Sequence, residues 1–164
     1  MSEYRFETEW TFVAPVEQVW AALTRPQDWP GWWPNVAKVE TLEPGDSRGI
    51  GGLQRYHWKT QLPYRLKFEM RTARVVEHQL LEGQAKGELE GLGRWTLRQD
   101  GVYCHVHYLW VVRTHKPWMN LLAPLLRPAF VWNHDRVMEQ GGHGLARHLG
   151  VALVGGAGPL AASS

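Results

Sequence analysis

Apolar and polar residues alternate with a period of two near the start of the chain. Between residues 4 and 13, side chains on one face are mostly aromatic, and those on the other face are mostly charged. The mostly aromatic face carries Tyr4, Phe6, Thr8, Trp10 and Phe12. A period of two with one charged face is typical of an antiparallel strand that buries only one side. We therefore expect a half-buried first strand.

The period changes after Pro15, a residue that suits the first turn of a helix. The apolar positions that follow share a spacing of three or four residues, and they are Val16, Val19, Trp20 and Leu23. This spacing predicts one apolar stripe on a short helix, which Pro26 ends. Residues 28–34 (DWPGWWP) predict a single turn or compact loop with partly packed tryptophans.

Period two returns over residues 36–114, which predict six strands separated by turns. Residues 43–52 form a glycine-rich loop, Pro63 marks a turn, and Asp100-Gly101 is a strong two-residue hairpin signal. Short connections favour antiparallel neighbours, because parallel strands need long crossovers. With the first strand, the sheet should contain about seven strands.

A period of 3.6 follows Lys116-Pro117 and predicts a long C-terminal helix. Its apolar stripe comprises Phe130, His134, Val137 or Met138, Gly141, Leu145 and Leu149. Pro124 and Pro128 are expected to break the approach into a shorter helix or an irregular segment. Residues 1–150 should form a single domain, and residues 151–164, rich in small side chains, a flexible tail.

These elements predict an α+β fold. Each strand has one charged face, so only one face of the sheet is covered, and the long helix is the available cover. We expect a curved antiparallel sheet of about seven strands wrapped around the C-terminal helix, with two short helices after the first strand.

Composition narrows the function classes. The 164 residues are 44% hydrophobic and 21% charged, which is ordinary for a globular chain. The net charge of +2 gives none of the strong positive field typical of nucleic-acid binding. We expect no membrane span, since the least polar stretch, residues 149–160, is short and glycine-rich. The single Cys104 and the lack of a signal-peptide pattern at residues 1–5 favour a cytoplasmic location. We expect a monomer or a homodimer, and the sequence does not distinguish between them.

The order of elements, with a first helix opening APVEQVW, resembles the START-like helix-grip fold of the SRPBCC superfamily. Residues 87–97 (GELEGLGRWTL), 110–119 (WVVRTHKPWM) and 122–149 resemble its polyketide cyclase/dehydrase branch. The resemblance covers residues 3–149. It implies a hydrophobic molecule held between sheet and helix, as in lipid transporters, ubiquinone chaperones, hormone receptors and aromatase/cyclases. It carries over no single catalytic motif.

Candidate ligand-binding residues are inner-face side chains toward the ends of the grip and on the long helix. They are Tyr56, Trp58, Phe68, Met70, Trp95, Tyr108, Trp110, His134 and Met138. The aromatic set could line a cavity or fill it. The small residues between Gly83 and Gly93 equally suit an open volume or the close approach of a large side chain. Gly141, Gly142 and Gly144 suggest packing clearance, a kink or a pocket mouth.

His134 and Tyr108 are the candidate catalytic residues. A buried neutral imidazole could exchange a proton with a carbonyl-bearing guest. The structural alternative is a core histidine bonded to a polar partner on the sheet. Asn133 and Asp135 should point to other faces, bonding locally or facing solvent.

No cofactor or metal is expected. His105 and His107 share a strand face, a pairing that can chelate a metal, but it is the outer face and no third ligand is evident. Cys104 lies on the apolar face and should be an inert thiol. The chain has no phosphate loop, no CxxC and no Ser-His-Asp order.

Three functions therefore stay open. The first is a module that binds a lipid, quinone, polyketide or similar aromatic compound, with no nucleic-acid partner. The second is a cyclase or dehydratase acting on a poly-carbonyl substrate in the same cavity. The third is an interaction protein in which Trp118, or the tryptophans at positions 29, 32 and 33, dock a partner; alternatively, those three cap the open end of the grip.

Overall fold

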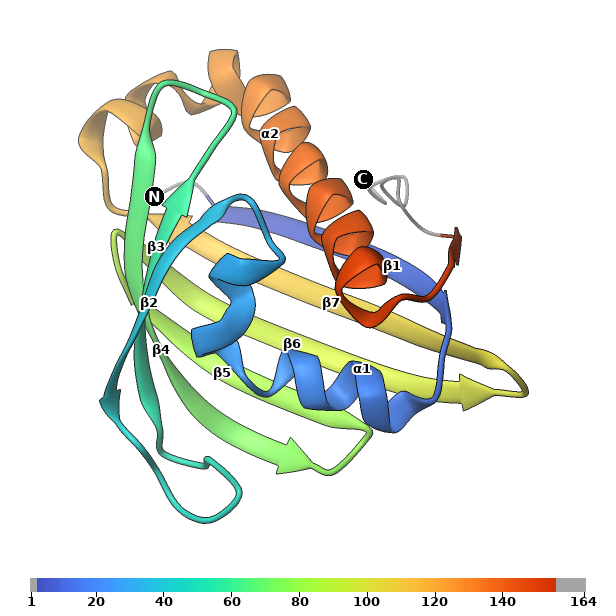
Figure 1. The fold of residues 1–164 in the computed structure, drawn as a ribbon. Coiled ribbons are helices and arrows are strands. Elements are labelled where there is room, and N and C mark those ends of the chain that lie inside the picture. Colours follow the sequence, from blue (N-terminus) through green and yellow to red (C-terminus); the bar gives the residue numbers. More distant parts are fainter. Residues whose placement is uncertain (1–2, 156–164) are drawn as a thin grey trace.

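A computed structural model describes residues 3–155 as one antiparallel sheet with helices on one side (Figure 1). The elements in chain order are β1 (Glu3–Val13), α1 (Val16–Leu23), the 3-10 helix η1 (Pro26–Gly31), β2 (Val36–Glu43), β3 (Leu53–Lys59), β4 (Arg65–Val76), β5 (Leu80–Gly87), β6 (Leu89–Asp100), β7 (Tyr103–Thr114), α2 (Pro117–Leu149) and β8 (Leu153–Gly155). The sheet order is β2-β3-β4-β5-β6-β7-β1-β8. The predicted α+β fold with a long C-terminal helix is confirmed.

The sheet has eight strands instead of about seven. Gly150 ends α2 with a left-handed backbone (φ 68°), which glycine adopts without strain, and turns the chain back. Leu153 then pairs with Phe12 of β1, and the Val13 amide donates to the Ala152 carbonyl at 3.0 Å. Part of the expected tail is therefore a strand. Residues 156–164 of that tail lie outside the described residues.

The helix α2 is continuous from Pro117 to Leu149, so the predicted break at Pro124 and Pro128 was wrong. Both prolines are exposed. Water can therefore bond to the carbonyl groups that lose their helical donors. Figure 1 shows the start of α2 turned away from the axis of its remainder, which is how a helix accommodates proline.

The tryptophans of residues 29–33 pack inside the molecule. Trp29, Trp32 and Trp33 are all buried, and Trp33 is only 1% exposed. Its Nε1 donates to the carbonyl of Val137 in α2 at 2.9 Å, across 104 residues of sequence. These three tryptophans are therefore part of the core, and the prediction that they dock a partner was wrong.

Three helical glycines give the tryptophans room against α2. A Cβ at Gly141 would lie 2.4 Å from the Trp33 ring, and one at Gly142 would lie 2.8 Å from Trp10 Nε1. At Gly144 the obstacle is backbone, because a Cβ would lie 1.9 Å from the Trp32 carbonyl oxygen. Packing clearance is therefore the reason for these glycines.

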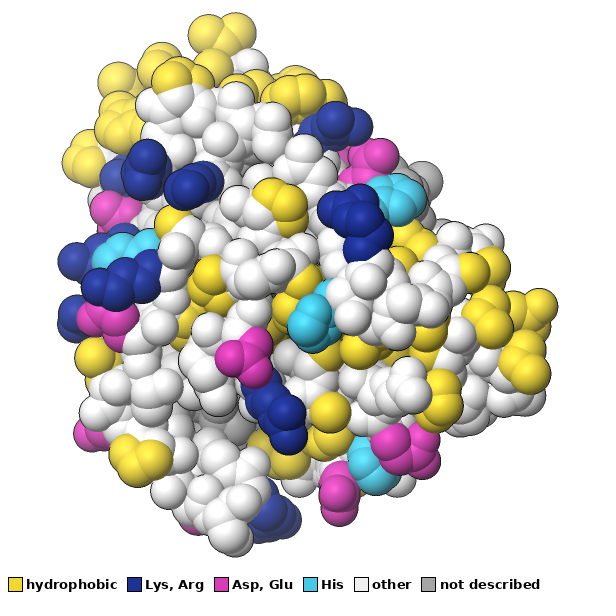
Figure 2. Space-filling view, in the orientation of Figure 1, with side chains coloured by type: hydrophobic (Ala, Val, Ile, Leu, Met, Phe, Trp, Pro, Cys, Tyr) yellow, Lys and Arg dark blue, Asp and Glu magenta, His cyan; other side chains and the backbone are white. Residues whose placement is uncertain are grey.

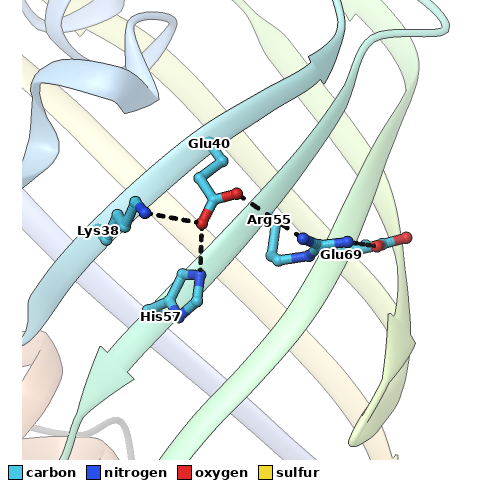
Figure 3. Close-up of polar contacts among 5 residues, drawn as sticks. All are labelled: Lys38, Glu40, Arg55, His57 and Glu69. Carbon is cyan, nitrogen blue, oxygen red and sulfur yellow. Dashed lines mark hydrogen bonds and ion pairs between the residues drawn. The ribbon is translucent and has the colours of Figure 1, made fainter.

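The outer face of the sheet carries cross-strand ion pairs (Figure 3). Glu40 lies 3.2 Å from Lys38 Nζ, 3.0 Å from His57 Nε2 and 3.7 Å from an Arg55 nitrogen. Arg55 also donates to Glu69 at 2.9 Å. Lys38, and then His57, hold the pKa of Glu40 below its ordinary value, against the opposing effect of burial. Such exposed pairs keep the face hydrated and contribute little stability individually.

Candidate ligand-binding site

Two adjoining cavities lie between the sheet and the helices. The first, here called the α2 cavity, has a volume of about 120 Å³ and is lined partly by Phe130, His134 and Met138 of α2. The second, the loop cavity, has a volume of about 130 Å³ and reaches Leu23 and the β2–β3 loop at Arg48. An apolar cavity of about 150 Å³ can hold benzene. Each space is therefore close in size to one aromatic ring.

Six aromatic side chains line both cavities and separate them. This partition comprises Trp29, Trp58, Phe68, Trp95, Tyr108 and Trp110. Their rings are in contact with one another, for example Trp95 and Tyr108 with centroids 4.0 Å apart. The aromatic residues thus both fill the interior and line the space that is left.

All nine candidate ligand-binding residues line one of these cavities. Five of them belong to the partition: Trp58, Phe68, Trp95, Tyr108 and Trp110. His134 and Met138 line the α2 cavity, whereas Tyr56 and Met70 line the loop cavity. The structure therefore brings them to one region but divides them between two spaces.

Several residues of the α2 cavity were not among the candidates, including Tyr4, Phe6, Tyr64 and Asn133. Tyr4 and Phe6 were on the predicted inner face, but the sequence did not show that β1 lies between β7 and β8, beside α2. Tyr64 follows the turn at Pro63. Only the long-range contacts of that turn place it at the cavity.

Asn133 faces inward, so the expectation that it bonds locally or faces solvent was wrong. It is 6% exposed, and its Oδ1 accepts a hydrogen bond from the Gln61 amide at 2.7 Å. Its Nδ2 lies 3.5 Å from the Tyr64 hydroxyl. The curved sheet covers a broad arc of α2, so neighbouring positions 133 and 134 can both face it. Asn133 thus fastens the β3–β4 connection to the helix.

His134 stacks on Phe6 of β1, with ring centroids 3.9 Å apart and the planes 13° apart. Both ring nitrogens are buried and, within residues 3–155, neither has a hydrogen-bond partner. The Asp135 carboxylate lies 3.6 Å from Nδ1, which is beyond hydrogen-bond distance. Burial lowers the pKa of His134 below its ordinary 6.5, and Asp135 opposes that shift. The imidazole is therefore neutral at pH 7.

The lowered pKa of His134 predicts a loss of stability in mild acid. The unfolded chain takes up a proton near pH 6.5, whereas the folded chain takes it up only at a lower pH. Protonation therefore favours the unfolded state as pH falls below about 6.5. Urea unfolding between pH 7.5 and pH 5 should show wild type losing more stability than His134→Gln. Parallel curves for the two proteins would contradict this assignment.

The α2 cavity also contains further polar atoms without protein partners. Among the described residues, the Tyr4 hydroxyl and Trp58 Nε1 are buried and unbonded, like the His134 nitrogens. Burial raises the pKa of Tyr4, while Arg127, 4.4 Å above its ring, opposes the shift. Buried polar groups in native structures usually have a partner. These atoms are therefore suited to a polar group on a guest molecule.

Tyr108 stacks between Trp95 and Trp110 on the sheet. Burial raises its pKa far above the ordinary value, and Tyr56 adds to the shift, so Tyr108 is a neutral phenol at pH 7. A Cβ at Gly93 would lie 2.9 Å from its hydroxyl. Gly93 therefore permits a close approach and also lines the loop cavity, so both interpretations of the strand glycines hold there.

Residues 3–155 contain no cluster of side chains suited to hold a metal ion. Such a cluster would need at least three His, Cys, Asp or Glu side chains close together. His105 contacts Thr11 and Asp100, and His107 contacts Glu7. Burial raises the pKa of Cys104 to about 11. No helix in the described part of the chain is long and apolar enough to cross a membrane.

Comparison with known proteins identifies the family. The family described as "Polyketide cyclase / dehydrase and lipid transport" matches residues 3–150. The chain belongs to this family. The matched residues include every element from β1 to α2 and all the residues that line the two cavities. Among curated proteins, a search found no significant match.

Solved structures share the fold at low sequence identity. The Zhui aromatase/cyclase from Streptomyces sp. R1128 has a TM-score of 0.74 and 15% identity, covering 91% of this chain and 94% of that one. The protein TTHA0849 from Thermus thermophilus has a TM-score of 0.72 and 13% identity, covering 88% of this chain and 99% of that one. Major latex-like protein 151 from Panax ginseng has a TM-score of 0.66 and 9% identity, covering 89% of this chain and 97% of that one. The family member thus has the predicted helix-grip fold, which these structures share.

Proposed function

We propose that this family member binds a neutral hydrophobic small molecule, with one ring in the α2 cavity and a polar oxygen beside His134. A lipid, quinone, polyketide or similar aromatic compound meets this description. The observation that carries the proposal is the set of unpartnered buried atoms of Tyr4, Trp58 and His134 around one apolar space. The family, and the aromatase/cyclases among its structural neighbours, support the same kind of guest.

The lining of the α2 cavity favours an uncharged guest. Lys59 is the one Lys, Arg, Asp or Glu among the described residues that line it. Because an ion in an apolar space without counter-charges pays a large desolvation cost, the buried part should be neutral. A guest larger than one ring would need the aromatic partition to move and join the α2 cavity to the loop cavity.

The unbonded atoms also favour an oxygen acceptor on the guest. The indole Nε1 of Trp58 can only donate a hydrogen bond, whereas the neutral His134 ring and the Tyr4 hydroxyl can donate or accept. A carbonyl or phenol oxygen would serve all three. The buried, unpaired Cys104 thiol suits a reducing compartment, and we place the function in the cytoplasm.

A matched pair of one-ring ligands, p-cresol and toluene, tests the polar end. Both fit a cavity of this size, but only p-cresol carries a hydroxyl. Wild type should bind p-cresol about fivefold more tightly, the value of one net hydrogen bond. His134→Phe keeps a ring on Phe6 and removes the nitrogens, so it should bind toluene as before and lose most of the preference. Calorimetry or NMR titration measures both affinities.

The experiment distinguishes failure of the proposed function from failure of the role given to His134. If a folded wild-type protein binds neither ligand, the proposed function is overturned. Binding of both with equal affinity would remove His134 as the polar anchor, and an unchanged preference in His134→Phe would do the same. Near-ultraviolet circular dichroism confirms that each variant is folded.

A second candidate function is a cyclase or dehydratase, favoured by the presence of Tyr108 and His134 in the same cavity. A neutral imidazole can accept a proton from the carbon between two carbonyl groups. A neutral phenol can donate a proton to the carbonyl oxygen that becomes a hydroxyl. Confinement of a flexible chain would supply the remaining rate enhancement.

His134→Gln and Tyr108→Phe test this candidate on a synthetic linear triketone. If the residues transfer protons, each variant should lower the cyclisation rate by about a hundredfold or more while binding is retained. Rates are followed by the absorbance of the aromatic product. Wild-type rates no faster than the uncatalysed reaction, or full activity in both variants, would exclude the two residues from catalysis.

A further inference from the structure

The loop cavity has a different lining from the α2 cavity. Side chains with hydroxyl, amide or guanidinium groups contribute to it, and they are Thr24, Arg48, Gln54, Tyr56, Thr72 and Tyr108. Pro44 and Arg48 are both exposed, so the cavity reaches solvent at the β2–β3 loop. Figure 1 shows this loop at the opposite end of the molecule from the start of α2. In the same orientation, Figure 2 shows hydrophobic side chains between the loop and α1, with Lys or Arg side chains beside them.

Tyr56 and Tyr108 bring two phenol groups to the inner side of the loop cavity. Tyr108 belongs to the partition, and Tyr56 stacks on Phe68 of the partition with ring centroids 6.1 Å apart. In residues 3–155, neither hydroxyl has a hydrogen-bond partner. Burial raises the pKa of both tyrosines, so both phenols are neutral at pH 7. Each can therefore donate a hydrogen bond to an oxygen of a guest.

Two glycines leave space beside these hydroxyls. Gly83 of β5 and Gly93 of β6 are direct partners in the sheet, and both line the loop cavity. A Cβ at Gly93 would lie 2.9 Å from the Tyr108 hydroxyl, and one at Gly83 would lie 3.0 Å from the terminal methyl carbon of Met70. Of the two cavities, Gly93 lines only the loop cavity, so the Tyr108 hydroxyl beside it faces that space.

Arg48 places an uncompensated positive charge at the mouth of the loop cavity. In the described part of the chain, its guanidinium has no ion-pair or hydrogen-bond partner. Two carboxylates of the region are already paired with other cations. Glu43 lies 2.7 Å from Arg71, and Glu82, which also lines the cavity, lies 2.6 Å from Arg94. The charge of Arg48 is therefore available to a guest.

Hydrogen bonds hold the backbone that carries Arg48. An Asp46 Oδ1 atom accepts hydrogen bonds from the amides of Arg48 and Ile50, at 2.8 Å and 3.0 Å, so this carboxylate also has partners. The Gly51 amide donates to the Thr72 carbonyl at 2.8 Å, which joins the loop to β4. Because a fixed loop loses less conformational entropy on binding than a mobile one, this backbone suits a recognition role.

Apolar walls, two inner donors and an outer cation together favour an aromatic carboxylate. The volume of about 130 Å³ is close to that needed by one ring, and the partition supplies aromatic walls. The planar guanidinium of Arg48 matches a carboxylate in charge and shape. An oxygen on the far side of the ring can accept a hydrogen bond from Tyr56 or Tyr108. A cationic guest would be repelled by Arg48, and a plain hydrocarbon would leave these polar groups unpaired.

We propose that the loop cavity is a second binding site, which takes an aromatic carboxylate with its ring beside the partition and its carboxylate on Arg48. The far end of the ring then lies near the Tyr56 and Tyr108 hydroxyls. The partition need not move, because each cavity has room for one ring. This site goes beyond the proposed function, which concerns a neutral guest in the α2 cavity.

Calorimetric titration with 4-hydroxybenzoate and 4-hydroxybenzamide at pH 7.5 tests the proposal. The two compounds have nearly the same shape, and both carry a hydroxyl on the far side of the ring, but only the benzoate is an anion. Wild type should bind the benzoate about fivefold more tightly in low salt, the upper range for an exposed ion pair. The preference should decrease as salt is raised. Arg48→Gln removes the charge, so it should bind both compounds equally.

The matched control is Arg25→Gln. Arg25 is also exposed and lies between Thr24 and Pro26, which line the loop cavity, but it does not line the cavity itself. This variant should keep the wild-type preference for the benzoate. Because both arginines are exposed, both variants should unfold at the wild-type temperature. An equal loss of the preference in the two variants would assign it to general surface charge and overturn the proposal.

An NMR titration of wild type locates the guest. Binding of 4-hydroxybenzoate should shift the amide signals of Gly83 and Gly93, whereas p-cresol should shift the ring signals of His134. No binding of 4-hydroxybenzoate by folded wild type, equal affinity for the two compounds, or an unchanged preference in Arg48→Gln would overturn the proposal. Shifts at His134 alone would place 4-hydroxybenzoate in the α2 cavity and overturn it too. Titration of p-cresol on the same preparations tests the proposed function separately.

Discussion

Replacement of Gly144 by alanine should destabilise the protein by about 3 kcal/mol, although alanine is the better helix former. In an open helical position this change would stabilise by about 1 kcal/mol. Here the new methyl group would lie 1.9 Å from the carbonyl oxygen of Trp32. Neither the helix nor the backbone after η1 can move without disturbing the buried tryptophans. The sign of the effect therefore reports how closely α2 approaches η1.

The measurement is urea unfolding followed by tryptophan fluorescence, with Gly31→Ala as the matched control. No atom lies within 4 Å of a Cβ at Gly31. Its replacement should change the free energy of unfolding by less than about 0.5 kcal/mol. For a chain of this length, the Gly144 variant should melt about 6–12 °C lower. A Gly144→Ala protein as stable as wild type would show that the helix packs farther from Trp32.

Filling the α2 cavity should abolish ligand binding. Val137 is buried and lines this cavity. Val137→Phe puts a ring into a space of about 120 Å³, which leaves no room for a second ring. We expect p-cresol affinity to fall at least about thirtyfold, because the apolar contacts and the hydrogen bond at His134 are lost together. Calorimetric titration of p-cresol measures the change.

The control for this variant is Val111→Phe. Val111 lies on β7 between Trp110 and Val112, which line the α2 cavity, so its side chain points to the other face of the sheet. It should bind p-cresol like wild type. Loss of binding in both variants would trace the effect to general disturbance of the fold, and retained binding in Val137→Phe would place the guest elsewhere.

The sheet could be predicted from the sequence because strand faces follow from local alternation. In β1, the side chains that the alternation assigned inward, such as Trp10 and Phe12, are buried, while Glu3 and Glu9 are exposed. Local pattern also located the turn after Asp100. The strand at residues 153–155 was missed because three residues carry no periodic signal. Its pairing with β1 follows instead from the turn at Gly150.

The candidate site was predicted less completely, because a cavity is a property of contacts between distant segments. Tyr108 and His134 were placed inward correctly, but Asn133 was not, since a single stripe understates how much of α2 the curved sheet covers. The three interpretations of the α2 glycines, which were packing clearance, a kink or a pocket mouth, could not be separated from the sequence either. Only the positions of Trp10 and Trp33 show that Gly141 and Gly142 serve packing.

The volumes of the two cavities also limit the size of the ligand that the protein can bind. A compound of several fused rings exceeds either cavity, so it would enter only if partition side chains such as Trp58 and Phe68 rotate aside. Those side chains are packed against other rings, so moving them costs contacts that the guest must replace. Binding strength should therefore depend on ring number more steeply than on hydrophobicity.

The most direct test of a guest space between the sheet and α2 is a crystal structure of the protein grown with p-cresol. We expect the ring between Phe6 and the partition, with its oxygen within hydrogen-bond distance of a His134 nitrogen or the Trp58 indole. An interior closed by the protein's own side chains, with p-cresol absent from it or found only on the surface, would contradict the account.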